Sequence, residues 1–207
     1  MKKKHIIFDM DGTLTDTARA TTIAIRELSD KFMLPAVSDK QVQSAMGLPG
    51  LDFYTYLFPE ISADVLRVIE READAAEEAI ISAMKKDILF PGIDDMLAKL
   101  SEAGYCLYIA STGSTRHVQS TLKTGEIDKY FAKVSCNESS KIAMVKKLIS
   151  PGDVDEWVMV GDMYKDSEAA RGNEILALGA GYGYLTEENY PLFDAILKKP
   201  EEIYSYI

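Results

Sequence analysis

Residues His5–Asp16 read HIIFDMDGTLTD, and the fold of the chain is organised around them. The apolar residues 6–8 are typical of a strand buried on both faces of a parallel sheet. Asp9 and Asp11 follow, and because side chains alternate along a strand, we expect both carboxylates to face one spot where the strand ends. Two like charges placed together require a metal cation or a shared proton. The stretch therefore predicts an acidic site at the end of the first strand.

The residues after the first carboxylate suit a tight turn beside a ligand. Gly12 allows the backbone to turn sharply and to approach a bound group closely, and Thr13 and Thr15 add hydroxyls. An Asp-Gly pair is also common in ordinary polar turns, which is the competing interpretation of this pair taken alone. The complete string favours a functional site.

Length and composition describe an acidic globular chain. The 207 residues are 47% hydrophobic and 27% charged, with a formal net charge of −10, which argues against nucleic acid or an anionic membrane as the main partner. Cys106 and Cys136 lack metal-ligand spacing and are interpreted as reduced thiols. We see no signal peptide and no apolar run that could span a bilayer, so we expect a cytoplasmic protein. The oligomeric state, monomer or homodimer, stays open.

Residues 17–86 carry helical patterns and no strand pattern. Apolar residues recur at helical spacing at Ile25, Leu28 and Phe32, and Ser38 can cap a short helix that Gly47 ends. The expected buried side of a long helix over 62–86 consists of Leu66, Ile69, Ala73 and Ile80. These patterns predict a small helical bundle inserted after the first strand. Residues 1–16 and 87–207 would then form a discontinuous α/β core, and residues 17–86 a helical domain inserted into it.

The remaining residues alternate between strand and helix patterns. The expected strands cover 105–110, 131–136, 157–160 and 175–178, and the expected helices cover 96–102, 114–123, 140–149 and 167–171. The apolar residues expected on the buried face of the helix over 140–149 are Ile142, Val145, Leu148 and Ile149. This alternation predicts a doubly wound, Rossmann-like parallel sheet of five strands, with ligands bound beyond their carboxyl ends.

Polar residues follow the second strand and open the helix after the third. Ser111 and Thr112 lead into a helix N-terminus, where hydroxyls and free amides form either an anion site or a simple cap. Lys141 lies near the start of its helix, where a cation is unfavourable. This position suggests an anion held nearby, although a solvated lysine is the simpler alternative.

Two further aspartates follow the fourth strand. Asp162 would sit at the strand end, as Asp9 does, and Asp166 lies at the threshold of a helix that it could also cap. Another carboxylate at an already acidic edge favours Mg²⁺, which prefers oxygen ligands and keeps several waters.

Together these segments resemble the haloacid dehalogenase superfamily of phosphotransferases. The four motifs of the superfamily are similar to residues 9–16, Ser111, Lys141, and Asp162 with Asp166. Gly47-Leu48-Pro49 and Gly181-Tyr182-Gly183 look most like its phosphoglycolate phosphatase branch. That branch often has Asn where Thr112 stands, and Pro is common where Ile142 stands. Neither departure removes a catalytic group.

The resemblance implies a Mg²⁺-dependent phosphatase that hydrolyses a small phosphorylated metabolite, a phosphoglycolate-like phosphomonoester. Asp9 would attack phosphorus and form an aspartyl-phosphate, and Asp11, with a raised pKa, would protonate the leaving oxygen and then deprotonate the attacking water. The groups that would hold Mg²⁺ are Asp9, the carbonyl of Asp11, Asp162 and, as ligand or support, Asp166. The groups that would hold the phosphoryl oxygens are Ser111, the catalytic Lys141, and backbone amides near Gly12 and Thr112. By the same resemblance, residues 1–16 and 87–207 would be the catalytic core, and residues 17–86 would be a helical cap domain that closes to exclude water.

Other activities stay open at this point. A sugar-phosphate mutase of the β-phosphoglucomutase kind or a pyrophosphatase could use the same scaffold, although the loop at Leu48-Pro49 lacks the hydrogen-bonding groups that a mutase cap needs. A catalytically silent module that binds a phospho-ligand would be expected to lack a motif carboxylate, and none is missing. His5 and His117 show no triad or metal spacing, and Arg19 and Arg116 are interpreted as surface residues. We expect none of these four side chains in the site.

Overall fold

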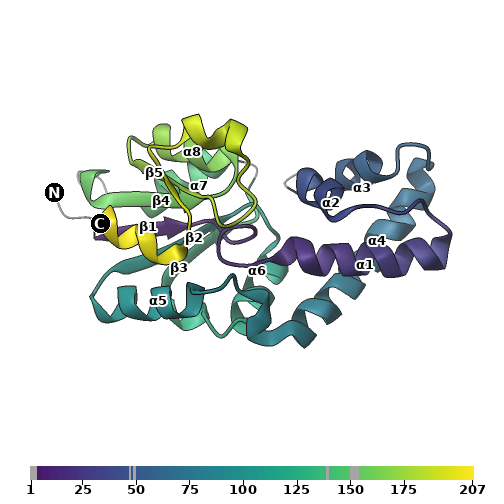
Figure 1. Cartoon of the computed structure of the whole chain (residues 1–207), viewed down its shortest axis with the longest axis horizontal. Helices are drawn as coiled ribbons and strands as arrows, with labels where there is room; N and C mark the ends of the chain where they lie inside the picture. The colour runs from purple at the N-terminus through teal and green to yellow at the C-terminus, as the bar shows by residue number, and fades with distance from the viewer. Residues whose placement is uncertain (1–3, 47, 49, 139, 150–153) are drawn as a thin grey trace. The chain divides into compact units, whose positions relative to one another are not determined.

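The computed structural model of the chain describes residues 4–46, 48, 50–138, 140–149 and 154–207. The described chain divides into two compact units, which Figure 1 shows as a sheet-containing unit and a helical unit. The first comprises the chain up to Asp16 together with Lys86–Ile207, and the second comprises Thr17–Lys85. The expected boundaries followed residues 16 and 86, so the second boundary falls one residue earlier than expected.

The first unit is built on a parallel sheet with the strand order β3-β2-β1-β4-β5-β6. The strands are β1 (His5–Phe8), β2 (Cys106–Ser111), β3 (Phe131–Cys136), β4 (Trp157–Gly161), β5 (Leu176–Ala180) and β6 (Ala195–Leu197). This arrangement confirms the predicted Rossmann-like α/β fold. Five strands were expected, and β6 is additional because a segment of three residues is too short to show a strand pattern.

Helices cover both faces of this sheet (Figure 1). They are α5 (Ile93–Glu102), α6 (Thr115–Thr124), α7 (Lys141–Leu148) and α8 (Tyr164–Arg171). Ile6 and Phe8 of β1 share a core cluster with residues of α5 and α6, whereas Ile7 shares one with residues of α7 and α8. Successive side chains of β1 therefore reach opposite layers, which is why the strand is an uninterrupted apolar run.

The order of the strands reverses its direction next to β1. The chain adds β2 and β3 on one side of β1, and β4, β5 and β6 on the other. β1 pairs with β4 from His5–Trp157 to Phe8–Val160, so the residues that follow these two strands leave the sheet at the same edge. Ligands of open α/β sheets bind at such a reversal point. Asp9 and Asp162 are the residues that follow β1 and β4.

Two helices of this unit differ from the sequence prediction. The residues that α7 buries are Lys141, Met144, Val145 and Leu148. The expected burial of Ile142 was wrong, because its side chain is 43% exposed. The prediction followed apolar character, whereas the inward-facing Lys141 places the buried face at the i, i+3, i+4 and i+7 positions. α8 begins at Tyr164, three residues before the expected start at Ser167, and this places Asp166 in its first turn.

The second unit is helical throughout its described elements. These are α1 (Thr17–Phe32), α2 (Asp39–Ala45), α3 (Leu51–Leu57) and α4 (Ala63–Met84). Their apolar faces meet in one cluster that contains Ile25 and Leu28 of α1 and Leu66 and Ile69 of α4. Further along α4 the buried residue is Ile81 and not the expected Ile80. Ser38 caps α2 as expected, and the helix end expected at Gly47 lies outside the described residues.

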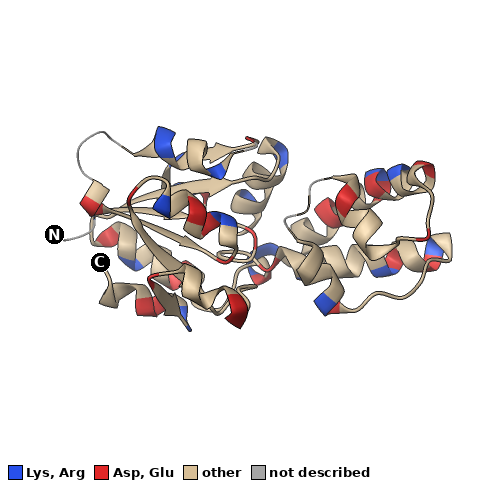
Figure 2. Ribbon diagram, turned by 90° about the horizontal axis from the view of Figure 1, so that it is seen from above, with Lys and Arg blue, Asp and Glu red and all other residues tan. Residues whose placement is uncertain are grey.

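Charged residues are distributed over both units. Figure 2 shows acidic and basic residues interspersed along the helices of each. Cys106 and Cys136 are both free. In the ranges that the structure describes, no helix combines the length and the apolar character needed to cross a bilayer.

Candidate active site

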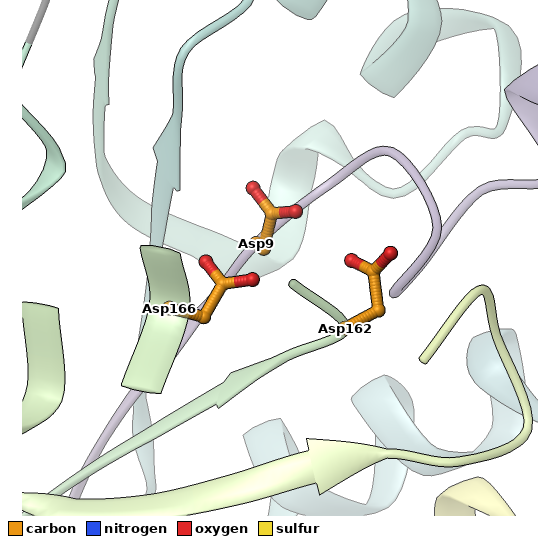
Figure 3. A group of neighbouring side chains, drawn as sticks. All are labelled: Asp9, Asp162 and Asp166. Atoms are coloured by element: carbon orange, nitrogen blue, oxygen red, sulfur yellow. The ribbon is translucent and has the colours of Figure 1, made fainter. Parts of the chain in front are cut away.

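Three aspartates meet at the carboxyl edge of β1 and β4 (Figure 3). Asp9 follows β1, Asp162 follows β4 and Asp166 lies in the first turn of α8. One carboxylate oxygen from each lies within 4.8 Å of the others, and the residues are only 6%, 1% and 0% exposed. We refer to Asp9, Asp162 and Asp166 as the buried carboxylate cluster. Three acidic groups that are this close together and this deeply buried from solvent need compensating positive charge.

Asp166 occupies its place because Gly161 leaves room for it. A Cβ atom on Gly161 would lie 2.2 Å from the carboxylate carbon of Asp166, a distance that no side chain tolerates. Met163 donates a backbone hydrogen bond of 2.9 Å to Asp166 Oδ2. The interpretation of Asp166 as a residue at the threshold of the helix is thus corrected, since it lies in the first turn and receives this bond across the helix start. Its other oxygen remains directed toward the cluster.

Asp162 is held by the turn that follows β1. Thr13 donates a hydrogen bond of 2.9 Å from its hydroxyl to Asp162 Oδ1. Gly12 has φ +84°, and a Cβ atom there would lie 2.3 Å from Asp162 Oδ2, so both the conformation and the close approach require glycine. Among the described residues, none forms a hydrogen bond with the buried Oδ2 atom. This oxygen is therefore available to a ligand.

Lys141 supplies the positive charge on the other side of the cluster. Its Nζ lies 2.6 Å from Asp9 Oδ1 and 2.5 Å from Asp166 Oδ1, and the residue is only 8% exposed. The sequence suggested an anion near this lysine, and the anions that it contacts in the structure are these two carboxylates. Both partners lie far from it in sequence, and the packing of α7 against α8 and β1 brings them close to it.

The charges of the cluster are not balanced. Burial raises the pKa of Asp9 to about 7, although Lys141 opposes the shift. Burial, followed by the charges of Asp9 and Asp166, raises the pKa of Asp162 well above its ordinary value. Burial alone would lower the pKa of Lys141, but the charges of Asp166 and Asp9 outweigh it and raise that pKa. Three carboxylates, one ammonium group and an oxygen without a hydrogen bond fit a hard divalent cation, which prefers carboxylate oxygens.

Asp11 is not one of the three residues of the buried carboxylate cluster, although its charge contributes to the raised pKa of Asp9. β1 ends at Phe8, before both Asp9 and Asp11, so alternation along the strand does not orient them, and their facing one spot stays a prediction. The side chain of Asp11 is 22% exposed, and its oxygens lie 3.0 and 3.1 Å from Nε2 of His117. We refer to these two residues as the Asp11–His117 pair.

The sequence analysis placed His117 outside the site, and the structure brings it to the motif aspartate. A spacing rule for triads or metal ligands could not find it, because the two residues are 106 positions apart. The available signal was the position of His117 in the first turn of the helix that follows β2, at the carboxyl edge of the sheet. Sequence reasoning also missed Tyr184, whose hydroxyl donates a hydrogen bond of 2.8 Å to Asp16.

The other predicted residues lie at the end of β2. Ser111 is buried, and its Oγ accepts a hydrogen bond of 3.1 Å from the backbone N–H of Gly113. Thr112 is exposed, as are Arg19 and Arg116. The loop residues Gly47 and Pro49, on which part of the family resemblance rested, lie outside the described residues.

Comparisons with known proteins identify the family. The profile of the family described as haloacid dehalogenase-like hydrolase matches residues 6–180. A phosphoglycolate phosphatase from Vibrio vulnificus is 29% identical, with 87% of this chain and 85% of the relative covered. A 5'-nucleotidase from Pseudomonas aeruginosa is 23% identical, with 91% of this chain and 87% of the relative covered.

Solved structures share the fold at lower identity. A haloacid dehalogenase-like family hydrolase from Streptococcus pneumoniae has a TM-score of 0.83 at 24% identity, covering 99% of this chain and 98% of the other. A β-phosphoglucomutase from Clostridium difficile has a TM-score of 0.76 at 17% identity, covering 99% and 95%. The predicted resemblance is confirmed: the chain belongs to the haloacid dehalogenase-like hydrolase family.

Proposed function

We propose that this hydrolase is a Mg²⁺-dependent phosphatase that acts on a small phosphorylated metabolite through an aspartyl-phosphate at Asp9. The observation that carries the proposal is the buried carboxylate cluster with Lys141 at its side. An acidic, dry site with one fixed ammonium group suits an anionic substrate only when a metal cation is also bound, which is the arrangement expected for phosphoryl transfer.

Mg²⁺ would be held by Asp9, by Asp162 and by the backbone carbonyl of Asp11, with Asp166 as a further ligand or a support. The unpartnered Oδ2 of Asp162 supports this assignment. When bound, the ion would supply the positive charge that offsets repulsion between the carboxylate of Asp9 and the phosphate. Thr13 fixes the orientation of Asp162 through its hydrogen bond and so would pre-arrange the ligand set.

Asp9 would act as the nucleophile. Its carboxylate would attack phosphorus while the bond to the leaving oxygen breaks, and Asp11 would donate a proton to that oxygen. Water would then attack the aspartyl-phosphate, Asp11 would take the proton of the water, and the carboxylate of Asp9 would be released. The environments fit this division of roles, because Asp9 is buried and Asp11 keeps contact with solvent.

The phosphoryl oxygens would be held by residues that converge on the same edge of the sheet. Lys141 would supply the charge, Ser111 and Thr112 would supply hydroxyl or amide groups, and the turn at Gly12 would supply backbone amides. Ser111 ends β2, the strand next to β1, and Thr112 follows it, which supports their assignment. The helical unit Thr17–Lys85 is the proposed cap, a role that follows from the family resemblance.

The proposed substrate class is a phosphoglycolate-like phosphomonoester. The likeness to phosphoglycolate phosphatases supports it, and the likeness to a 5'-nucleotidase also favours a small phosphomonoester. A β-phosphoglucomutase shares the fold, so phosphoryl transfer to a sugar is the alternative reaction. The intact carboxylates argue against a silent binding module. The free cysteines and the acidic composition fit the cytoplasm.

Phosphate release from a panel of phosphorylated metabolites tests the proposal. The panel contains phosphoglycolate, nucleoside monophosphates, sugar phosphates and pyrophosphate, each with Mg²⁺ and with a chelator. We expect phosphate from one or more phosphomonoesters with Mg²⁺ and none with the chelator. Isomerisation of a sugar phosphate without phosphate release would favour the mutase, and absence of both reactions would contradict an enzymatic function for this site.

A further inference from the structure

His117 contacts both oxygens of the Asp11 carboxylate with one ring nitrogen. Its Nε2 lies 3.0 Å from one oxygen and 3.1 Å from the other. When the Asp11 carboxylate is ionised it only accepts hydrogen bonds, and in that state the Nε2–H of His117 donates to both oxygens. The contact joins the turn after β1 to the first turn of α6, so the fold and not the local sequence brings the two residues together.

The end of α6 fixes the position of the imidazole. Ser114 caps this helix, and its Oγ accepts a hydrogen bond of 3.2 Å from the backbone N–H of His117. A Cβ atom on Gly113 would lie 3.1 Å from ring carbon Cδ2 of His117, so the ring packs closely over that glycine. β2 leads into this helix end and pairs with β1. A rigid part of the sheet edge therefore presents the imidazole to Asp11.

We propose that His117 is a positioning residue that orients the carboxyl group of Asp11 for proton transfer. The inference rests on the function proposed above, in which Asp11 is the acid and base. A proton donor must lie within hydrogen-bond reach of the leaving oxygen and point toward it. The side chain of Asp11 is 22% exposed, and a contact to both of its oxygens fixes the direction in which its carboxyl group points.

His117 takes no net part in the proton transfers. Asp11 gives its proton to the leaving oxygen as the bond from phosphorus to that oxygen breaks and the bond to Asp9 forms. In the second half-reaction, Asp11 takes a proton from the water that attacks phosphorus, and the bond to Asp9 breaks. The Nε2 proton of His117 stays on its ring in both steps. His117 therefore acts only through Asp11.

This role predicts that the effect of His117 depends on the leaving group. An alkoxide is a strong base and needs a proton as it leaves, whereas p-nitrophenolate leaves without one. Loss of the contact between His117 and Asp11 should therefore slow the first half-reaction with an alkyl phosphate. The rate of the same half-reaction with p-nitrophenyl phosphate should not change. Damage to the buried carboxylate cluster would slow both substrates, because both need Asp9.

Rapid-quench measurement of the first turnover tests the inference. The variants are His117→Phe, which keeps a ring without a donor, His117→Asn, whose donor is too short to reach Asp11, and His117→Gln, whose amide N–H can reach it. Gln119→Ala, an exposed position on the same helix, is the control. The substrates are p-nitrophenyl phosphate and the alkyl phosphate that the wild-type enzyme hydrolyses best, and circular dichroism verifies the fold.

We expect His117→Phe and His117→Asn to lower the first-turnover rate with the alkyl phosphate by about 10- to 100-fold. This loss is part of the rate enhancement that a general acid contributes. The p-nitrophenol burst should keep its wild-type rate, and His117→Gln should recover most of the alkyl phosphate rate. Equal losses with both substrates, or His117 variants with the same rates as Gln119→Ala, would overturn the positioning role of His117 and leave the proposed function standing. A wild-type enzyme that turns over neither substrate would overturn the proposed function and this inference with it.

Discussion

The carboxylates of Asp9 and Asp11 belong to one turn, and they meet opposite surroundings. Asp9 is buried in the carboxylate cluster, where ion pairs with Lys141 replace water. Asp11 keeps contact with solvent, and its partner is an imidazole ring. Both residues follow the end of β1 at Phe8, and only Met10 stands between them.

The contrast shows how one short motif can serve two kinds of chemistry. In the cluster, burial raises the pKa of two carboxyl groups and creates a demand for cations. In the Asp11–His117 pair, partial exposure leaves the carboxyl group able to exchange protons with water and with a leaving group. A nucleophile suits the first environment, and a general acid and base suits the second.

The largest expected effect is a difference in catalytic rate between variants of Asp9 and of Asp11. Asp9→Asn removes the nucleophile and should lower kcat by about 10⁴-fold or more with every substrate. Asp11→Asn should lower the first-turnover rate by about 10²- to 10⁴-fold with an alkyl phosphate and spare the p-nitrophenol burst. Rapid-quench kinetics measures both, with the exposed Asp128→Asn as the control. The same loss pattern in both variants would show that the two environments do not divide the chemistry.

The next effect tests whether the cluster depends on its buried cation. Lys141→Met leaves Asp9 and Asp166 without their ammonium partner, and the free energy of unfolding in chelator should fall by about 3–5 kcal/mol. Lys147→Met, on the same helix, removes an exposed ion pair with Glu138 and should cost no more than about 1 kcal/mol. Urea unfolding of both variants measures the difference. Equal costs would mean that burial does not strengthen the lysine contacts.

The smallest expected effect tests the unbalanced charge of the cluster. Burial raises the pKa of Asp162, so the folded state disfavours its ionised form. At pH values above the ordinary pKa of a carboxyl group, a variant with a neutral side chain should therefore be more stable than the wild-type protein. In chelator at neutral pH, Asp162→Asn should raise the free energy of unfolding by about 1–3 kcal/mol, the order of magnitude gained when a costly buried charge is replaced by a neutral group of similar volume. Mg²⁺ should stabilise the wild-type protein and not this variant. Destabilisation in chelator would contradict the proposed repulsion, and Asp128→Asn is again the control.

The sequence was sufficient for the fold and for most of the site because the relevant signals are local. The apolar run of β1 and the alternation of strands and helices follow from periodicity, and Asp9 and Asp162 were found because each directly follows a buried strand. Asp166 and Lys141 were singled out by their positions at helix starts, and the family motifs then favoured a functional role for each. Their mutual contact depends on how α7 and α8 pack, which no local pattern describes.

The errors arose where tertiary packing overrides local character. Ile142 was expected to be buried because it is apolar, yet the inward turn of Lys141 rotates it to the surface. His117 was set aside because spacing rules look for partners nearby in sequence, whereas its partner comes from another strand end. β6 was missed because three residues hold too little pattern.

The measurement that tests the central claim most directly is chemical trapping of the phosphorylated residue. The enzyme is mixed with its preferred substrate and Mg²⁺, quenched within the first turnover and treated with borohydride, which reduces an aspartyl-phosphate to homoserine. Peptide sequencing then locates the product. We predict homoserine at position 9, formed only when substrate and Mg²⁺ are both present and absent in Asp9→Asn. Homoserine at another position, or none at position 9 while phosphate is released, would contradict Asp9 as the nucleophile.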